Sequence, residues 1–543
     1  MRNGKLRLIA LLLAAALLLS GCELVDFGGY FRGLKSVLAE DSAMIPFDSM
    51  EYSRPDLADI RAQLDTAICT AESELNTVEA VVDAIYSFYD GYDWFYTCYS
   101  LADIHYSADL TDIFWEKEYT YCQENSGAVD AMLEELYYAL AQSPHRQALE
   151  AEEYFGAGYF DSYDGENLWD EEFVALLERE SELQNRYYTL SAEALDYESG
   201  TEAYYDACAG DMAQLLVELV ALRQEMAAYW GYTDYVQFAN DFYYYRDYTP
   251  AEMAAYLAEI SRELAPLYCN VTDADWEAAY DYSTEKQTLA YVRSAAKNMG
   301  GIILEAFELM EDGKLYDISY GPNKYNSSFE VYLTSYWEPF VFMNPTMSRY
   351  DCLTFAHEFG HFCNDYASYG SYAGIDVMEV FSQGMEYLSL CYSEEGQTLV
   401  RSKMADSLCV YVEQAAYAAF EQRMYALTGD DLSVEGLCAL YEEVAREYGF
   451  ESVGYDPREF ITITHYYTNP MYVISYVVSN DAAMQLYQLE RETTGAGLKR
   501  FEENLDTQEV YFLEFVDTAG LESPLAEGRV QSVRKIFEET LGS

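Results

Sequence analysis

The sequence predicts a mainly α-helical protein with one small β-sheet. The 543 residues contain eleven prolines, and none lies between Pro55 and Pro144, between Pro144 and Pro250, or between Pro345 and Pro457. Because proline interrupts helices, these long gaps favour uninterrupted helical segments. Apolar residues recur at helical spacing along the chain, and one block rich in aromatic and β-branched residues departs from that spacing.

The composition excludes several functions. The chain has 31 Lys and Arg against 95 Asp and Glu, a formal net charge of −64 and a pI near 4.1. This charge argues against nucleic-acid binding, which needs clustered basic residues, and against electrostatic docking on an anionic membrane. Hydrophobic residues make up 51% of the chain and aromatic residues 16%, which is enough for a core. The acidity therefore indicates a solvated surface and not disorder.

The N-terminus predicts a bacterial lipoprotein signal. Three basic residues precede an apolar run over residues 8–19, which is too short to span a bilayer and is typical of a signal peptide. The residues Leu-Ser-Gly before Cys22 resemble a lipobox. That resemblance implies that residues 1–21 are removed and that Cys22 becomes a lipid-modified N-terminus. An ordinary signal peptide with an incidental Cys22 is the alternative.

Lipid attachment implies an extracytoplasmic protein that is anchored to the cell membrane. Residues 22–45 then form a tether between the lipid and the folded body. No other stretch is apolar enough to span a bilayer, so the anchor is expected to be the lipid alone. The mature chain has 28 basic against 95 acidic residues, which gives a charge of −67.

Helical stripes follow the tether. Apolar residues recur every three or four positions over residues 57–68 and 78–88, which predicts two amphipathic helices. Thr249 and Glu252 form a capping box around Pro250, which predicts the start of another helix there. We divide the body into an N-terminal helical lobe, residues 46–205, and a catalytic lobe, residues 206–543.

The block that departs from helical spacing is residues 324–344, KYNSSFEVYLTSYWEPFVFMN. It is dense in aromatic and β-branched residues, and Pro322, Pro339 and Pro345 lie around it. This pattern predicts two or three short strands, a small sheet set beside helices.

An HExxH motif carries the clearest chemistry. His357 and His361 lie four positions apart, so a helix places both imidazoles on one side, about 6 Å apart along its axis, where both reach one metal ion. Glu358 follows the first histidine and can point at a metal-bound water. Because the chain has only five histidines, chance predicts about 0.008 such motifs. Apolar flanks predict a helix that ends before Gly370 and Gly374.

A catalytic zinc site needs a third protein ligand and one open position. A helical pattern restarts at Asp376, and two antiparallel helices joined by a short loop would bring Glu379 back over the motif. No third histidine is in range, so two histidines and one carboxylate are the predicted zinc ligands. Glu386 lies seven positions further along and could orient a ligand from behind. Asp376 could do the same, or it could cap the helix.

These residues resemble a known family. HEFGH at residues 357–361, followed by DVMEVFSQGME at residues 376–386, is similar to the zinc site of the thimet oligopeptidase and oligoendopeptidase F family. The resemblance implies a two-lobed helical metallopeptidase with a deep substrate channel and a small β-sheet beside the zinc-site helices. It also implies one zinc ion, with the carboxylate of Glu379 as the third ligand, and short peptides as substrates.

Two further segments resemble the same family. Lys324 and Tyr325 are similar to the edge strand on which its members lay the substrate backbone. The segment that starts at His465 resembles the family's histidine-and-tyrosine segment opposite the zinc. The resemblance implies that His465 and one tyrosine bind substrate and stabilise the oxyanion. Tyr472 and Tyr476 are our first choices for that tyrosine, followed by Tyr466 and Tyr467.

The predicted function is zinc-dependent endopeptidase activity on oligopeptides by a monomer. In this mechanism zinc activates a water and polarises the scissile carbonyl, and Glu358 moves the proton of that water to the leaving amine. His465 and Tyr472 or Tyr476 donate hydrogen bonds to the oxyanion.

Two alternatives remain open from the sequence. A zinc carboxypeptidase or dipeptidyl carboxypeptidase on a related scaffold would need a cation for the terminal carboxylate of its substrate. Lys324 and Arg349 are close to the site in sequence, but neither stands out for that role. A non-catalytic peptide-binding lipoprotein is the other alternative, although a binding protein has no use for a general base beside a metal.

Overall fold

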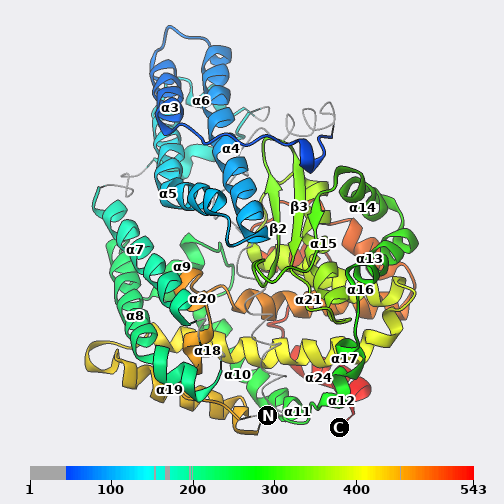
Figure 1. Ribbon diagram of the computed structural model, residues 1–543. Coiled ribbons are helices and arrows are strands. Elements are labelled where there is room, and N and C mark those ends of the chain that lie inside the picture. Colours follow the sequence, from blue (N-terminus) through cyan, green and yellow to red (C-terminus); the bar gives the residue numbers. More distant parts are fainter. Residues whose placement is uncertain are drawn as a thin grey trace.

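The computed structural model describes residues 44–151, 154–164, 171–194, 197, 200–452 and 454–542. The predicted signal peptide, Cys22 and the tether up to residue 43 lie outside the described residues. Helices dominate the rest, and one small sheet lies among them (Figure 1). This is the mainly α fold that the sequence predicts. Within the described part of the chain, no helix combines the length and apolar character needed to cross a membrane.

The first helices have a hydrophobic core of their own. The apolar stripes predicted at residues 57–68 and 78–88 are the buried faces of α3 and α4, which pack on each other and on α5. Asp56, Thr77 and Asp112 cap the three helices through their side chains. The buried residues of this core lie between Ile60 and Phe160. The elements are α3 Leu57–Glu72, α4 Val78–Ala108, α5 Ile113–Ala141 and α6 Arg146–Leu149.

The next helices lead into the main core. α7 and α8 form an antiparallel pair, and Tyr204 and Tyr205 of α8 already pack in the main core. The proposed division between residues 205 and 206 falls inside α8 and stays a prediction. The capping box of Thr249 and Glu252 is confirmed at the start of α10. The elements are α7 Glu171–Ala194, α8 Glu202–Tyr229, α9 Tyr235–Phe242, α10 Pro250–Glu263, α11 Ala265–Tyr268, α12 Asp273–Tyr280, α13 Glu285–Met299 and α14 Gly301–Gly313.

The predicted sheet has three strands in the order β1-β3-β2. β1, Tyr316–Asp317, pairs in parallel with β3, Glu338–Met343, and β2, Ser328–Leu333, pairs antiparallel with β3. β2 is therefore an edge strand. Since it begins at Ser328, the prediction that Lys324 and Tyr325 lie on the edge strand is wrong: they lie in the loop before it.

The helix that carries the HEFGH sequence lies between the sheet and a second helix. α15, Asp351–Ser368, packs on β2 and β3 and also on α16, Ile375–Tyr392, which packs on α21, Ile474–Glu492 (Figure 1). Gly360 permits the close approach of α15 and α16, because a Cβ at this position would lie 2.4 Å from the carbonyl oxygen of Phe381. The fourth residue of the motif thus serves packing.

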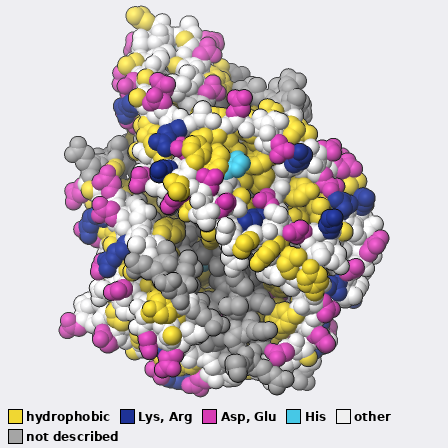
Figure 2. Space-filling view, in the orientation of Figure 1, with side chains coloured by type: hydrophobic (Ala, Val, Ile, Leu, Met, Phe, Trp, Pro, Cys, Tyr) yellow, Lys and Arg dark blue, Asp and Glu magenta, His cyan; other side chains and the backbone are white. Residues whose placement is uncertain are grey.

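Among the described residues, seven further helices lie in the second half of the chain. They are α17 Gly396–Cys409, α18 Ala415–Met424, α19 Val434–Glu447, α20 His465–Thr468, α22 Ala496–Glu502, α23 Phe512–Thr518 and α24 Arg529–Leu541. On the face shown in Figure 2, acidic side chains are scattered among basic and hydrophobic ones and do not gather in one patch.

Candidate metal centre

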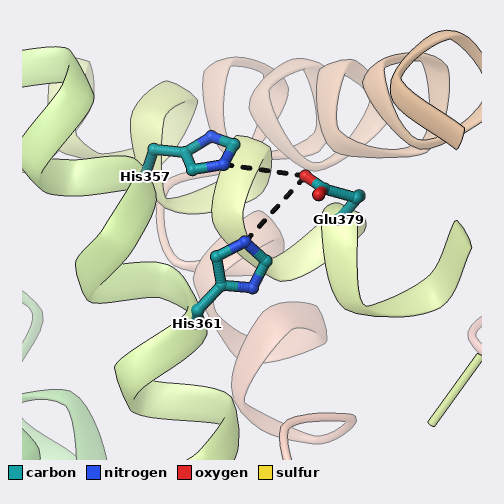
Figure 3. Close-up of side chains that lie close together, drawn as sticks. All are labelled: His357, His361 and Glu379. Carbon is teal, nitrogen blue, oxygen red and sulfur yellow. Dashed lines mark ion pairs between the residues drawn. The ribbon is translucent and has the colours of Figure 1, made fainter. Parts of the chain in front are cut away.

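Two neighbouring helices bring three ligand atoms together. His357 and His361 extend from α15, and Glu379 extends from α16 toward both of them (Figure 3). One Glu379 oxygen, Oε2, lies 3.6 Å from His357 Nε2 and 4.0 Å from His361 Nε2. One donor atom from each residue fits within 4.8 Å of the others, and all three side chains are buried.

This donor set suits a zinc ion. Two imidazole nitrogens and one carboxylate oxygen are the ligands of a catalytic zinc site with an open fourth position. His357 Nε2 is buried and has no hydrogen-bond partner among the described residues, although it faces the carboxylate of Glu379. A buried polar atom without a partner is costly, so the site is prepared for a cation at this point.

A buried chain of charges supports His357 from behind. Its other nitrogen, Nδ1, lies 2.9 Å from Glu386 Oε1, and Lys403 Nζ donates to Glu386 Oε2 at 2.6 Å and to Asp406 Oδ2 at 2.9 Å. Tyr350 donates to the other oxygen of Asp406. A carboxylate at Nδ1 fixes the ring orientation and leaves Nε2 free to bind a metal.

Without a metal, the two histidines differ in their protonation. Burial lowers the pKa of His357, but the hydrogen bond to Glu386 and the charge of Glu379 outweigh it and raise the pKa to about 9. Burial and the neighbouring His357 lower the pKa of His361 well below its usual value. A cation that binds here therefore displaces a proton from His357.

Glu358 lies on the side of α15 that faces the sheet. Ser328, at the start of β2, donates a hydrogen bond to Glu358 Oε1 at 2.7 Å. Burial raises the pKa of Glu358 to about 7, with the positive His357 and the Ser328 hydroxyl acting in the opposite direction. A carboxyl group with a pKa near neutrality is suited to accept and return a proton.

Glu379 is held by two hydroxyl groups. Tyr472 donates to Oε1 at 2.9 Å, and Ser382, one turn along α16, donates to Oε2 at 2.9 Å. Burial still raises the pKa of Glu379 above its usual value. Tyr472 thus reaches the ligand set directly.

His465 and Tyr476 lie next to Tyr472. The rings of His465 and Tyr472 are 5.3 Å apart, and His465 Nε2 lies 3.3 Å from the Tyr476 hydroxyl. Burial lowers the pKa of His465 to about 4, so its ring is neutral at pH 7. The three side chains form one group beside Glu379.

Tyr466 and Tyr467 point elsewhere. Both are fully buried, and their hydroxyls donate to the carbonyl oxygens of Tyr417 and Met212. Tyr467 also stacks on Tyr187 at 4.1 Å between ring centroids. These two tyrosines hold the main chain around His465, and their hydroxyls are engaged away from the ligands.

Lys324 and Tyr325 also have structural contacts. The Lys324 ammonium is buried, donates to the carbonyls of Ser319 and Met343, and pairs with Asp317 at 2.9 Å. The Tyr325 amide donates to the Ser107 carbonyl, which joins this loop to the end of α4.

Asp376, in the first turn of α16, is bound by side chains from other segments of the chain. Arg246 donates to both of its oxygens at 3.2 Å, and Tyr248 and Ser475 donate to it as well. The helix N-cap is Gly374. Neither predicted role, helix capping or direct support of a ligand histidine, is therefore found among the described contacts.

Two residues that support the site, Ser328 and Lys403, were not predicted from the sequence. Ser328 lies within the predicted strand block. The closeness of that block to the HEFGH helix in the sequence was the one indication that Ser328 could reach the site. Lys403 is one of 31 basic residues in a chain with 95 acidic residues. It follows Leu399 by one helical turn, on the helix after Glu386, and this helical spacing was the sequence signal for a buried position.

The chain is similar to several known proteins. Residues 47–166 match the family model described as Peptidase M3 N-terminal domain. No curated protein sequence matches the chain. Among solved structures, PZ peptidase A, determined with an inhibitor, aligns with a TM-score of 0.78 at 18% identity, over 91% of this chain and 99% of that one.

Two proteins provisionally assigned as oligoendopeptidase F align similarly. One has a TM-score of 0.76 at 20% identity, over 92% of this chain and 99% of its own. The other, from Bacillus anthracis, has a TM-score of 0.75 at 21% identity, over 92% of this chain and 98% of its own. The fold is thus shared over nearly the whole length of these proteins.

Proposed function

Because the M3 N-terminal domain and the shared fold confirm the resemblance to the oligoendopeptidase F family, we propose that this chain is a zinc-dependent endopeptidase acting on short peptides. The observation that carries the proposal is the buried His357, His361 and Glu379 cluster with Glu358 beside it. These three residues would hold the zinc. When bound, zinc supplies Lewis-acid activation of water and of the scissile carbonyl.

Glu358 moves the proton in this proposal. Its carboxylate accepts a proton from the attacking water and returns it to the nitrogen of the leaving amine. Ser328 holds one of its oxygens and leaves the other available to the water. Burial raises its pKa to about 7, so the carboxylate is partly ionised at pH 7, mostly ionised above pH 7, and still basic enough to bind the proton.

His465, Tyr476 and Tyr472 bind the developing oxyanion. A neutral imidazole and a phenol are both hydrogen-bond donors that cost little reorganisation in a buried site. His465 Nδ1 is buried without a partner among the described residues, and this unmet hydrogen-bonding capacity favours a role in substrate binding. Tyr472 holds Glu379 as well, so it links ligand geometry to substrate binding.

Export and lipid attachment complete the proposal. Cys22 carries the lipid, and the catalytic lobe works outside the cytoplasmic membrane as a monomer. Replacement of Cys22 by Ala, followed by membrane fractionation, tests the anchor. A variant that still partitions with membranes would contradict it.

The activity is tested with an internally quenched fluorescent peptide. We expect the purified chain to cleave it, a chelator to abolish cleavage, and added zinc to restore it. Amidated and free-acid forms of the same peptide separate the two kinds of peptidase. Equal cleavage of both forms supports an endopeptidase, whereas a requirement for the free carboxylate would indicate a carboxypeptidase. Metal-independent cleavage, or none, would reject the proposal.

A further inference from the structure

The helix that carries His465 is short. α20, His465–Thr468, has four residues, and the chain turns away at Asn469. A helix leaves its last four carbonyl groups without helical partners, so most of the carbonyls of α20 need another donor. Tyr466 and Tyr467 are fully buried, and water cannot fill this need at low cost.

Two other helices provide the donors. Arg223, on α8, donates to the Tyr466 carbonyl at 2.5 Å and to the Tyr467 carbonyl at 2.6 Å. Gln184, on α7, donates to the Thr468 carbonyl at 3.2 Å. Figure 1 shows α20 beside the α7 and α8 pair, in agreement with the contacts between them. The guanidinium fork thus caps the C-terminal end of α20, where positive charge is favourable.

The charge of Arg223 needs a partner of its own. Its side chain is fully buried, and its Nε donates to Glu180 Oε1, on α7, at 2.6 Å. Burial of an unpaired guanidinium is costly, so Glu180 keeps Arg223 charged and in place. Glu180 is itself only 12% exposed, which limits competition from water.

Hydrogen bonds do little to fix the His465 ring, which packs against the rings of Tyr472 and Tyr476. Its Nε2 contacts the Tyr476 hydroxyl at 3.3 Å, and its Nδ1 has no partner among the described residues. The direction of the imidazole therefore depends on its main chain, which is the first turn of α20. A shift of about 1 Å in a reacting group can cost about 10²-fold in rate.

We propose that Arg223 and Glu180 form a clamp in which α7 and α8 set the position of His465. The inference rests on the proposed peptidase function. Arg223 is a positioning residue here, since it acts through the main chain of α20 and not on substrate. The segment before α20 is tied to the same helix, because Tyr187 of α7 donates to Thr464 Oγ1 at 2.8 Å.

The test compares two ion pairs between α7 and α8. Arg223→Met removes the clamp. Arg186→Met removes the exposed pair of Arg186 with Glu218, which joins the same helices without touching α20, so it is the matched control. We expect Arg223→Met to lower kcat by about 10- to 100-fold with little change in KM and unchanged zinc content. Arg186→Met should keep the wild-type kcat, KM and zinc content.

Backbone amide exchange over residues 464–468 gives a readout that does not need activity. Arg223→Met should exchange faster there than the wild type and than Arg186→Met. If the wild-type protein hydrolyses no peptide, the proposed function fails, and the exchange comparison still decides whether the clamp exists. A wild-type kcat together with wild-type exchange in folded Arg223→Met would overturn the inference.

A second variant covers the case in which Arg223→Met does not fold. Glu180→Gln keeps an oxygen for Arg223 Nε but removes the countercharge, so we expect a smaller loss of kcat in the same direction and faster exchange over residues 464–468. Unchanged kcat and unchanged exchange in this variant would also overturn the inference.

Discussion

The metal ligands and the His465 segment are built in different ways. The proposed ligands come from α15 and α16, and most of their supports are close in the chain: Ser382 and Glu386 on α16 and Lys403 on α17. Tyr472 is the support that reaches Glu379 from the other half. The segment from His465 to Tyr476 is instead held by residues distant in the chain. One half of the site is a local product of two packed helices, and the other half is imposed by the rest of the fold.

The strain in the second half shows this dependence. Met471 has a φ of 68°, a left-handed conformation that costs a non-glycine residue about 1–3 kcal/mol. Its amide donates to Glu421 Oε1, on α18, at 2.6 Å, and Tyr244 donates to the Pro470 carbonyl at 2.7 Å. Buried polar groups from two distant elements therefore maintain a turn that the segment would not adopt alone.

The largest effect is expected at the ligand carboxylate. Glu379→Ala should lose zinc and with it all peptide hydrolysis, because two histidines alone make a weak site. Elemental analysis of the purified variant measures the metal. Glu308→Ala, at an exposed position of α14, is the control and should keep stoichiometric zinc. Unchanged zinc in Glu379→Ala would remove Glu379 from the ligand set.

The next largest effect is expected at the oxyanion donors. His465→Ala and Tyr476→Phe should each lower kcat, because each removes about 2–4 kcal/mol of transition-state stabilisation. Both variants should keep zinc, because neither residue is a proposed ligand. Steady-state kinetics with metal analysis checks this. Tyr282→Phe, at a tyrosine that is 70% exposed, is the matched control. Loss of zinc in either variant would show that the two halves of the site are not separable.

The anchoring of Met471 should depend on pH. Burial raises the pKa of Glu421 to about 7, above its usual value of 4.5. Between these two pKa values the folded protein keeps a proton on Glu421 that the unfolded chain releases. The contribution of protonated Glu421 to the free energy of unfolding is therefore fully present below pH 4.5 and is lost as the pH rises to 7. Glu421→Gln keeps an oxygen for the Met471 amide but does not titrate. Relative to this variant, the wild type should lose about 1–3 kcal/mol of unfolding free energy over that range, at about 1.36 kcal/mol per pKa unit.

Urea unfolding of zinc-free protein at pH 4.5 and pH 7.5 measures the difference. Glu308→Gln, at the exposed position of α14, should follow the wild type at both pH values. A constant difference between the wild type and Glu421→Gln would contradict the assignment of a neutral, buried Glu421.

The smallest effect is expected behind His357. Lys403→Met leaves Glu386 and Asp406 buried without their shared cation, so Glu386 should hold His357 less well. We expect zinc affinity to fall about 10- to 100-fold, as for other residues that orient a ligand. Competition with a chromophoric chelator measures it. Lys499→Met, in an exposed pair with Glu503, should be unaffected, and equal affinity in Lys403→Met would exclude this support.

Features that depend on residues close in the chain could be predicted from the sequence. The helical spacing of His357, Glu358 and His361 is local, and Glu379 follows after one short loop, so pattern alone indicated all four. The strand block and the capping box at Thr249 were likewise set by neighbouring residues.

Contacts between distant segments could not be predicted from local sequence patterns. Arg223 meets Tyr466 across 243 positions, and nothing near either residue indicates the pair. Lys324 was expected at the substrate and is instead buried in its own loop, because the pairing of β2 with β3 decides where the edge strand begins. Asp376 was expected either to orient a ligand or to cap its helix, and Arg246, on a remote segment, binds it instead.

The most direct test of the central claim is peptide cleavage by Glu358→Gln loaded with zinc. The amide can still accept the Ser328 hydrogen bond but cannot take a proton. We predict a zinc content equal to that of the wild type and a kcat/KM lower by about 10²- to 10⁴-fold. Retained turnover at full zinc occupancy would contradict the assignment of Glu358 as the proton-transfer group of a zinc peptidase.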